Sequence, residues 1–96
     1  MVIYISGQIT DNPNYKMEFT KAVLYARTHY PNAVIINPII LPDGLTYNAY
    51  MDIDMAFIRA CDTILMIPNW ENSKGARGEL AYAECLKKKV MYMEAK

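Results

Sequence analysis

The sequence predicts a single α/β domain, with a four-stranded parallel sheet and helices on both faces. Four short, uniformly apolar runs alternate with three amphipathic patterns of helical spacing, which gives the order βαβαβαβ typical of a covered parallel sheet. The chain has 96 residues, of which 53% are hydrophobic and 21% charged, and this suits one domain over residues 1–96. All five prolines fall in the expected loops or at strand ends, which supports the segmentation.

The first βα unit is expected to occupy the first 30 residues. A buried strand is predicted over residues 2–6, because the run is rich in β-branched and aromatic residues and Gly7 closes it. Residues 7–14 are rich in turn formers and should form a loop. Apolar residues then recur at helical spacing over residues 15–30, and Pro31 ends this second element.

The rest of the chain repeats the pattern. A second strand is predicted over residues 33–36, and residues 37–46 form a loop with its own Pro-Asp-Gly turn. The remaining elements are a helix over residues 47–61, a strand over 63–67, a polar loop over 68–74, a helix from about 75 to 88 and a strand over 90–93. Ligands of open parallel sheets bind beyond the carboxyl ends of the strands, so a site is expected in loops 7–14, 37–46 and 68–74.

Charge and composition exclude several classes of protein. Ten basic and ten acidic residues give a formal net charge of zero, which argues against a binder of polymeric nucleic acid. The longest uncharged run, residues 30–42, is interrupted by prolines, and the N-terminus lacks the features of a signal peptide. We therefore expect a cytoplasmic protein without a membrane partner. The sequence shows neither a metal-ligand cluster nor a nucleotide-cofactor motif, so no metal and no cofactor is predicted.

Two acidic residues occupy positions that a plain core does not require. Asp54 lies on the apolar stripe of the helix predicted over residues 47–61, whereas Asp52 lies off it. Glu79 begins the apolar stripe of the next helix. Asp54 could instead be satisfied by backbone amides or point to solvent, and Glu79 could simply complement the helix dipole. If both point to one sheet edge, they form paired carboxylates in a cleft.

Paired carboxylates of this kind suit glycosidic chemistry. One carboxylate attacks the anomeric carbon while another group handles the proton of the leaving group. Glu79 is expected to be ionised near neutral pH, because it follows the positive end of a helix. The sequence thus predicts Glu79 as a competent nucleophile.

Two loops and the start of the third predicted helix offer further candidates for ligand binding. Gly7 and Gly75 allow the backbone to approach a ligand closely, and the helix amides that follow Ser73 favour an anionic group. Lys74 and Arg77 could bind a phosphate, or could equally be solvated surface charges. Trp70 could stack on a base, or serve as a packing lid or an oligomer contact.

Three stretches of the sequence resemble the nucleoside 2-deoxyribosyltransferase superfamily. They are the segment from Tyr4 to Thr10, the segment from Asp54 to Asp62, and Ser-Lys-Gly-Ala-Arg-Gly-Glu at residues 73–79. The chain is most similar to short bacterial and phage domains and to the deoxyribonucleoside 5′-monophosphate N-glycosidases. With the element order, this resemblance implies a Rossmann-like or flavodoxin-like fold.

The resemblance also implies roles for individual residues. Glu79 would be the nucleophile that forms a covalent 2-deoxyribosyl intermediate, Asp54 would orient the sugar or assist proton transfer, and Tyr4 would contact the nucleophile or the sugar. The substrate would be held by the first loop, with Gly7, Gln8, Ile9 and Thr10, and by Ser73 and Gly75 on the sugar or phosphate side. The deoxyribosyltransferases have Gly-Thr before the catalytic segment, where this chain has Lys-Gly-Ala-Arg-Gly at residues 74–78. We therefore expect different side chains to line this side of the substrate site.

Three functions remain open at this point. The first is an N-glycosidase or 2-deoxyribosyltransferase acting on a nucleoside or nucleotide. The second is a non-catalytic domain that binds or sequesters nucleotides, and the third is a scaffold with a vestigial cleft. Related active enzymes form homo-oligomers and receive a residue from a neighbouring subunit, supplied beyond the last strand. We therefore expect a dimer or higher oligomer, in which another surface replaces that residue or the site stays incomplete.

Overall fold

Four parallel strands form the central sheet of the protein. The computed structural model describes residues 1–94. The strands are β1 (Val2–Ser6), β2 (Val34–Ile36), β3 (Thr63–Met66) and β4 (Lys89–Tyr92). They are hydrogen-bonded in the order β2-β1-β3-β4, and each neighbouring pair is parallel. This is the order of flavodoxin-like sheets, so the predicted α/β fold is confirmed.

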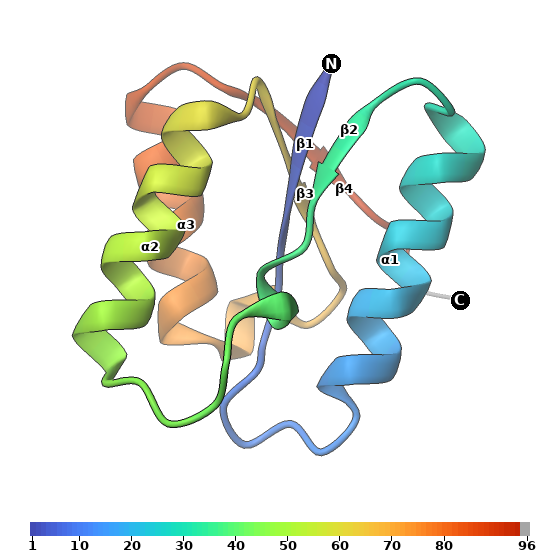
Figure 1. The fold of residues 1–96 in the computed structure, drawn as a ribbon. Helices are drawn as coiled ribbons and strands as arrows, with labels where there is room; N and C mark the ends of the chain where they lie inside the picture. The colour runs from blue at the N-terminus through green and yellow to red at the C-terminus, as the bar shows by residue number, and fades with distance from the viewer. Residues whose placement is uncertain (95–96) are drawn as a thin grey trace.

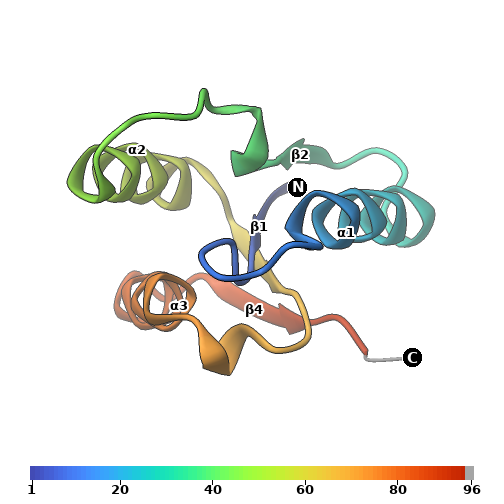
Figure 2. The same ribbon diagram turned by 90° about the horizontal axis from the view of Figure 1, so that it is seen from below.

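The helices cover both faces of the sheet. Helix α1 (Tyr15–His29) lies on one face, and α2 (Tyr47–Ala60) and α3 (Lys74–Cys85) lie side by side on the other (Figures 1 and 2). Two short 3₁₀ helices, η1 (Pro38–Ile40) and η2 (Trp70–Asn72), occupy the loops after β2 and β3. No helix within residues 1–94 is long and apolar enough to cross a membrane.

Strand alternation divides the core into two sides. Ile3 and Ile5 of β1 pack with α1 residues such as Phe19, whereas Tyr4 packs with Ile58 of α2 and residues of α3. Side chains two residues apart on a strand share one face. Ser6 therefore lies on the same face as Tyr4, at the carboxyl end of the strand and toward α2 and α3.

The third helix ends three residues earlier than the sequence predicts. Lys87 adopts a left-handed backbone conformation with φ of 59°. The Lys88 N–H donates to the Ala83 carbonyl at 2.9 Å, and the Lys87 N–H donates to the Glu84 carbonyl at 3.0 Å. These two bonds form a Schellman cap, which glycine usually provides. Because a lysine and not a glycine occupies that position here, the sequence does not indicate where the helix ends. Strand β4 begins at Lys89, one residue before its predicted start.

Candidate active site

A cavity of about 520 Å³ lies at the carboxyl ends of β1 and β3. Its walls are residues 7–11 after β1, the segment from η1 to the first two turns of α2, and residues 72–76 with Glu79 from α3. The chain leads from β1 to β2 on one side and from β3 to β4 on the other, so the strand order reverses between β1 and β3. Open α/β sheets bind their ligands at such a point. The cavity thus occupies the place that the sequence predicts.

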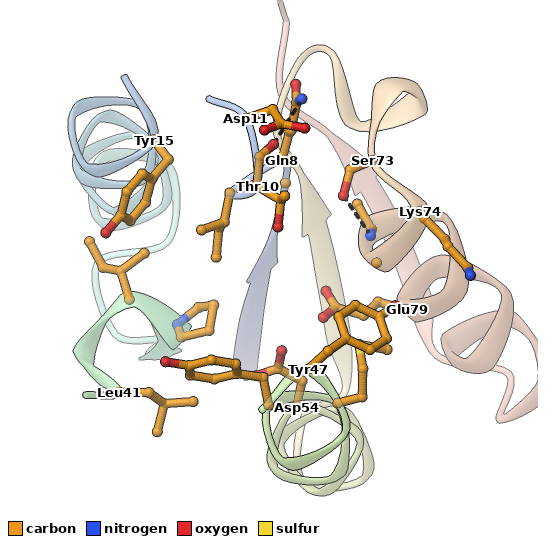
Figure 3. A pocket seen from close by; sticks show the side chains of 18 of the residues that line it. Gln8, Thr10, Asp11, Tyr15, Leu41, Tyr47, Asp54, Ser73, Lys74 and Glu79 are labelled. Atoms are coloured by element: carbon orange, nitrogen blue, oxygen red, sulfur yellow. Dashed lines mark hydrogen bonds between the residues drawn. The ribbon is translucent and has the colours of Figure 1, made fainter. Parts of the chain in front are cut away.

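Both predicted acids face this cavity. Asp54 reaches it from α2 and Glu79 from α3, and their carboxyl groups approach the same space (Figure 3). Only 8% of Asp54 and 6% of Glu79 is exposed. Asp52, predicted to lie off the apolar stripe, is exposed. Helical periodicity therefore placed both carboxyl groups correctly, on helices that pack side by side.

Local sequence features hold the two helices in place. The Thr46 hydroxyl oxygen accepts a hydrogen bond from the Ala49 N–H at 3.1 Å and caps α2. The Ser73 hydroxyl oxygen caps α3 by accepting from the Ala76 N–H at 3.1 Å. Glu79 lies in the second turn of α3, and Asp54 lies just beyond the second turn of α2. Each acid is on the same helix face as the apolar residues that pack into the core.

Strand β1 supplies the floor below the acids. The Ser6 hydroxyl donates a hydrogen bond of 2.6 Å to Glu79 Oε1, and both side chains are buried. Tyr4 is fully buried on the same strand face and does not line the cavity. Its hydroxyl and Asp54 Oδ1 are buried without a hydrogen-bond partner among residues 1–94. An unpartnered buried polar atom is costly, and of these two residues only Asp54 lines the cavity, where its carboxyl group can bond a ligand or exchange a proton.

Burial dominates the electrostatics of the site. Loss of water raises the pKa of Glu79 to about 8, and neighbouring Asp54 adds to the shift. Burial also raises the pKa of Asp54. Burial, with the charges of Glu79 and Asp54, raises the pKa of Tyr4 well above its ordinary value. Two close carboxyl groups in such a setting resist ionising together, so the site retains a proton near neutral pH.

This result corrects the expectation that the helix dipole keeps Glu79 ionised. Glu79 is the sixth residue of α3, beyond the first turn in which the dipole is strongest. The loss of hydration outweighs the remaining dipole field. Glu79 is therefore largely protonated at neutral pH.

The start of α3 offers donors to a ligand. Lys74 and Gly75 are its first two residues, whose N–H groups have no partner within the helix. Both residues and Ser73 line the cavity, as do Gly7, Gln8, Ile9 and Thr10 of the first loop. The Lys74 side chain is exposed and extends away from the other labelled residues (Figure 3). Its backbone thus faces the cavity more directly than its ammonium group does.

The structure does not bring Trp70 and Arg77 to the cavity. Trp70 packs against the core on the α3 side, with its ring centroid 6.0 Å from that of Tyr92. The Arg77 guanidinium donates to the Glu71 carbonyl at 2.5 Å and so braces the η2 loop. Neither residue lines the cavity, because the Trp70 ring is taken up by packing and Arg77, on α3, bonds back to the preceding loop.

Other cavity residues escaped the sequence analysis. Tyr47 and Tyr50 of α2 line the cavity, as does Tyr15 at the start of α1. Asp11 and Leu41, from two of the expected loops, line it as well; Figure 3 labels all of these except Tyr50. Tyr50 also donates its hydroxyl to the Pro42 carbonyl at 2.6 Å and accepts from the Leu45 N–H at 3.2 Å. Ser6 was the other omission; a polar residue two positions after Tyr4 at a strand end was the available signal. Within residues 1–94, no cluster of three or more His, Cys, Asp or Glu residues could hold a metal ion.

Comparison with known proteins identifies relatives of the chain and of its fold. Residues 1–92 match the family described as Domain of unknown function (DUF4406). No curated protein matches. Among solved structures, a 2-desoxiribosyltransferase from Leishmania mexicana is similar with a TM-score of 0.73 and 22% sequence identity. The alignment covers 99% of this chain and 65% of that chain. At this identity the similarity shows the fold, and the present chain spans about two thirds of the enzyme's length.

Proposed function

The chain belongs to the DUF4406 family, and we propose that it cleaves the N-glycosidic bond of a nucleoside or nucleotide through a covalent glycosyl ester on Glu79. One observation carries the proposal: Asp54 and Glu79, from different helices, are both buried against one ligand-sized cavity. The cavity volume of about 520 Å³ lies within the range typical of small-molecule sites. The fold shared with a 2-desoxiribosyltransferase is consistent with this chemistry.

A proton retained by the acid pair suits a double-displacement reaction. When Asp54 holds this proton, ionised Glu79 can attack the anomeric carbon of the sugar. The bond from carbon to base breaks, its electron pair leaves with the base nitrogen, and Asp54 supplies the proton. Water, deprotonated by Asp54, then attacks the same carbon, releases the sugar and regenerates Glu79. A second base in place of water would give transfer instead of hydrolysis.

The first experiment measures release of free base. Wild-type protein is incubated with each common 2′-deoxynucleoside and its 5′-monophosphate, and the products are separated by chromatography. Glu79→Gln should abolish release, while Glu84→Gln, an exposed glutamate of the same helix, should leave it unchanged. Mass spectrometry of acid-quenched protein should find a deoxyribosyl group on the peptide that contains Glu79. Absence of base release with every substrate would contradict the proposal.

A second candidate function is nucleotide binding without turnover. The observation that favours it is the Glu79 pKa of about 8, which leaves the proposed nucleophile mostly protonated at neutral pH. Thermal-shift measurements with the same nucleosides and nucleotides address this candidate. Stabilisation by a nucleotide, without base release between pH 6 and about 9, would favour binding alone.

A further inference from the structure

Ser6 makes the shortest polar contact to the proposed nucleophile. Its hydroxyl lies 2.6 Å from Glu79 Oε1, and 1% of Ser6 and 6% of Glu79 is exposed. A hydroxyl that donates to a carboxylate in a water-poor setting forms a short, strong bond. Since Ser6 does not line the cavity, this contact lies behind the carboxyl group and not on its substrate side.

The backbone around Ser6 leaves little freedom for this contact. Ser6 is the last residue of β1 and pairs with Met66, and its carbonyl accepts a hydrogen bond from the Ile67 N–H at 2.8 Å. At the next residue, Gly7, an added Cβ would come within 3.0 Å of the Ile67 side chain. The end of β1 thus packs closely against the residue that follows β3, and this packing limits the movement of the Ser6 hydroxyl relative to α3.

We propose that Ser6 is the positioning residue of Glu79: its hydroxyl holds Oε1, so that Oε2 is the oxygen that attacks the sugar. This inference rests on the proposed function. Oε2 forms the bond to the anomeric carbon as the bond to the base breaks, and Oε1 becomes the carbonyl oxygen of the ester. The Ser6 hydroxyl can donate to Oε1 in both states, so the same bond orients the nucleophile and the intermediate.

The bond also acts on the charge of Glu79. The groups that face this carboxyl are Ser6 and Tyr4 from β1 and Asp54 from α2. Burial and Asp54 raise its pKa, whereas the hydrogen bond from the Ser6 hydroxyl lowers it. A hydroxyl donor favours the ionised carboxylate, which is the form that attacks. Ser6 therefore opposes the effect of burial at the moment when a nucleophile is needed.

The test compares Ser6→Ala, which removes the hydroxyl, with Ser6→Thr, which retains it. Titration of the Glu79 carboxyl carbon is followed by NMR in protein labelled at glutamate, with the signal assigned from its loss in Glu79→Gln. The pH dependence of base release is measured in parallel. Thr63→Val is the matched control, because Thr63 is an equally buried hydroxyl that donates to Asp62 instead.

We expect Ser6→Ala to move the Glu79 titration and the pH profile to higher pH and to lower kcat at pH 7 by about 10- to 100-fold, with KM little changed. Ser6→Thr should restore both, and Thr63→Val should affect stability alone. An unchanged Glu79 titration in Ser6→Ala would overturn the inference even in an active enzyme. Wild-type protein that releases no base would instead contradict the proposed function. If Ser6→Ala fails to fold, Ser6→Cys, a weaker donor, takes its place in the same measurements.

Discussion

Asp54 and Glu79 lie on neighbouring helices that follow different strands, and their carboxyl groups meet at the wall of one cavity. Twenty-four residues of helix, strand and loop separate them in the sequence, yet each influences the ionisation of the other. Because burial raises the pKa of both, the pair retains a proton near neutral pH. The proton that the pair retains therefore bears on the pH dependence of stability and on the proposed chemistry.

The first prediction concerns the pH dependence of stability. The folded-state pKa of Glu79 is about 8, against an ordinary value of 4.5. Between these values the folded state binds more protons than the unfolded state, so stability falls as pH rises. The free energy of unfolding should decrease by up to about 1.4 kcal/mol per pH unit in this window. Glu79→Gln, which cannot ionise, should show a flatter profile in urea unfolding. Parallel profiles for the two proteins would contradict the raised pKa.

The second prediction separates function from stability at Asp54. Asp54 is 8% exposed, and its Oδ1 has no hydrogen-bond partner among the described residues. Replacing an under-satisfied buried acid by an apolar group of similar size should cost little stability or increase it. Asp54→Leu should therefore fold at least as well as wild type, yet lose base release and nucleotide binding. A loss of several kcal/mol in urea unfolding would identify Asp54 as a structural acid. Asp52→Leu, at an exposed site of the same helix, is the control.

The third prediction concerns the close packing at the end of β1. A Cβ at Gly7 would lie 3.0 Å from two atoms of the buried Ile67 side chain. Gly7→Ala should therefore destabilise the protein by about 1–3 kcal/mol through overpacking. In Gly78→Ala, the added Cβ meets nothing within 4 Å on an exposed helix position. That control should gain about 0.5–1 kcal/mol from better helix propensity. Chemical denaturation measures both, and equal shifts would contradict the packing argument.

The fourth prediction concerns the cavity wall formed by the start of α2. The Tyr50 hydroxyl ties this helix to the preceding loop through the Pro42 carbonyl and the Leu45 N–H. Tyr50→Phe removes both bonds and should raise the KM or the Kd for the ligand several-fold, with a stability loss of about 1 kcal/mol. Tyr47→Phe, at a more exposed residue of the same wall, should change the Kd less. A Tyr50→Phe variant with wild-type affinity would show that the loop does not depend on this hydroxyl.

Much of the fold and the pair of acids could be predicted from local patterns. The order of strands and helices follows from apolar periodicity and turn residues, because these depend on neighbours in the sequence. Asp54 and Glu79 stood out since each acid occupies a position on its helix that periodicity assigns to the core. Ser6 did not stand out, because strand alternation fixes its face but not the side chain that it meets there.

The loop side chains were the least predictable. Trp70 lies in η2 and Arg77 in the first turn of α3, next to a loop that borders the cavity, but neither side chain lines it. A helix end was misplaced for a related reason, because Lys87 adopts a left-handed conformation that glycine usually provides. In both cases the outcome depends on the backbone conformation of a few residues, which the residue types there do not specify.

The sequence by itself determined the α/β class, the parallel sheet, the edge where the cavity lies and the two acids that face it. Only the tertiary structure decided that Ser6 bonds Glu79, that Tyr4 lies beneath the site, and that Glu79 holds its proton to about pH 8. The physical reason is that periodicity reports which side of an element is buried. A hydrogen bond or a pKa depends instead on which atoms meet inside, and on how much water they lose when they do.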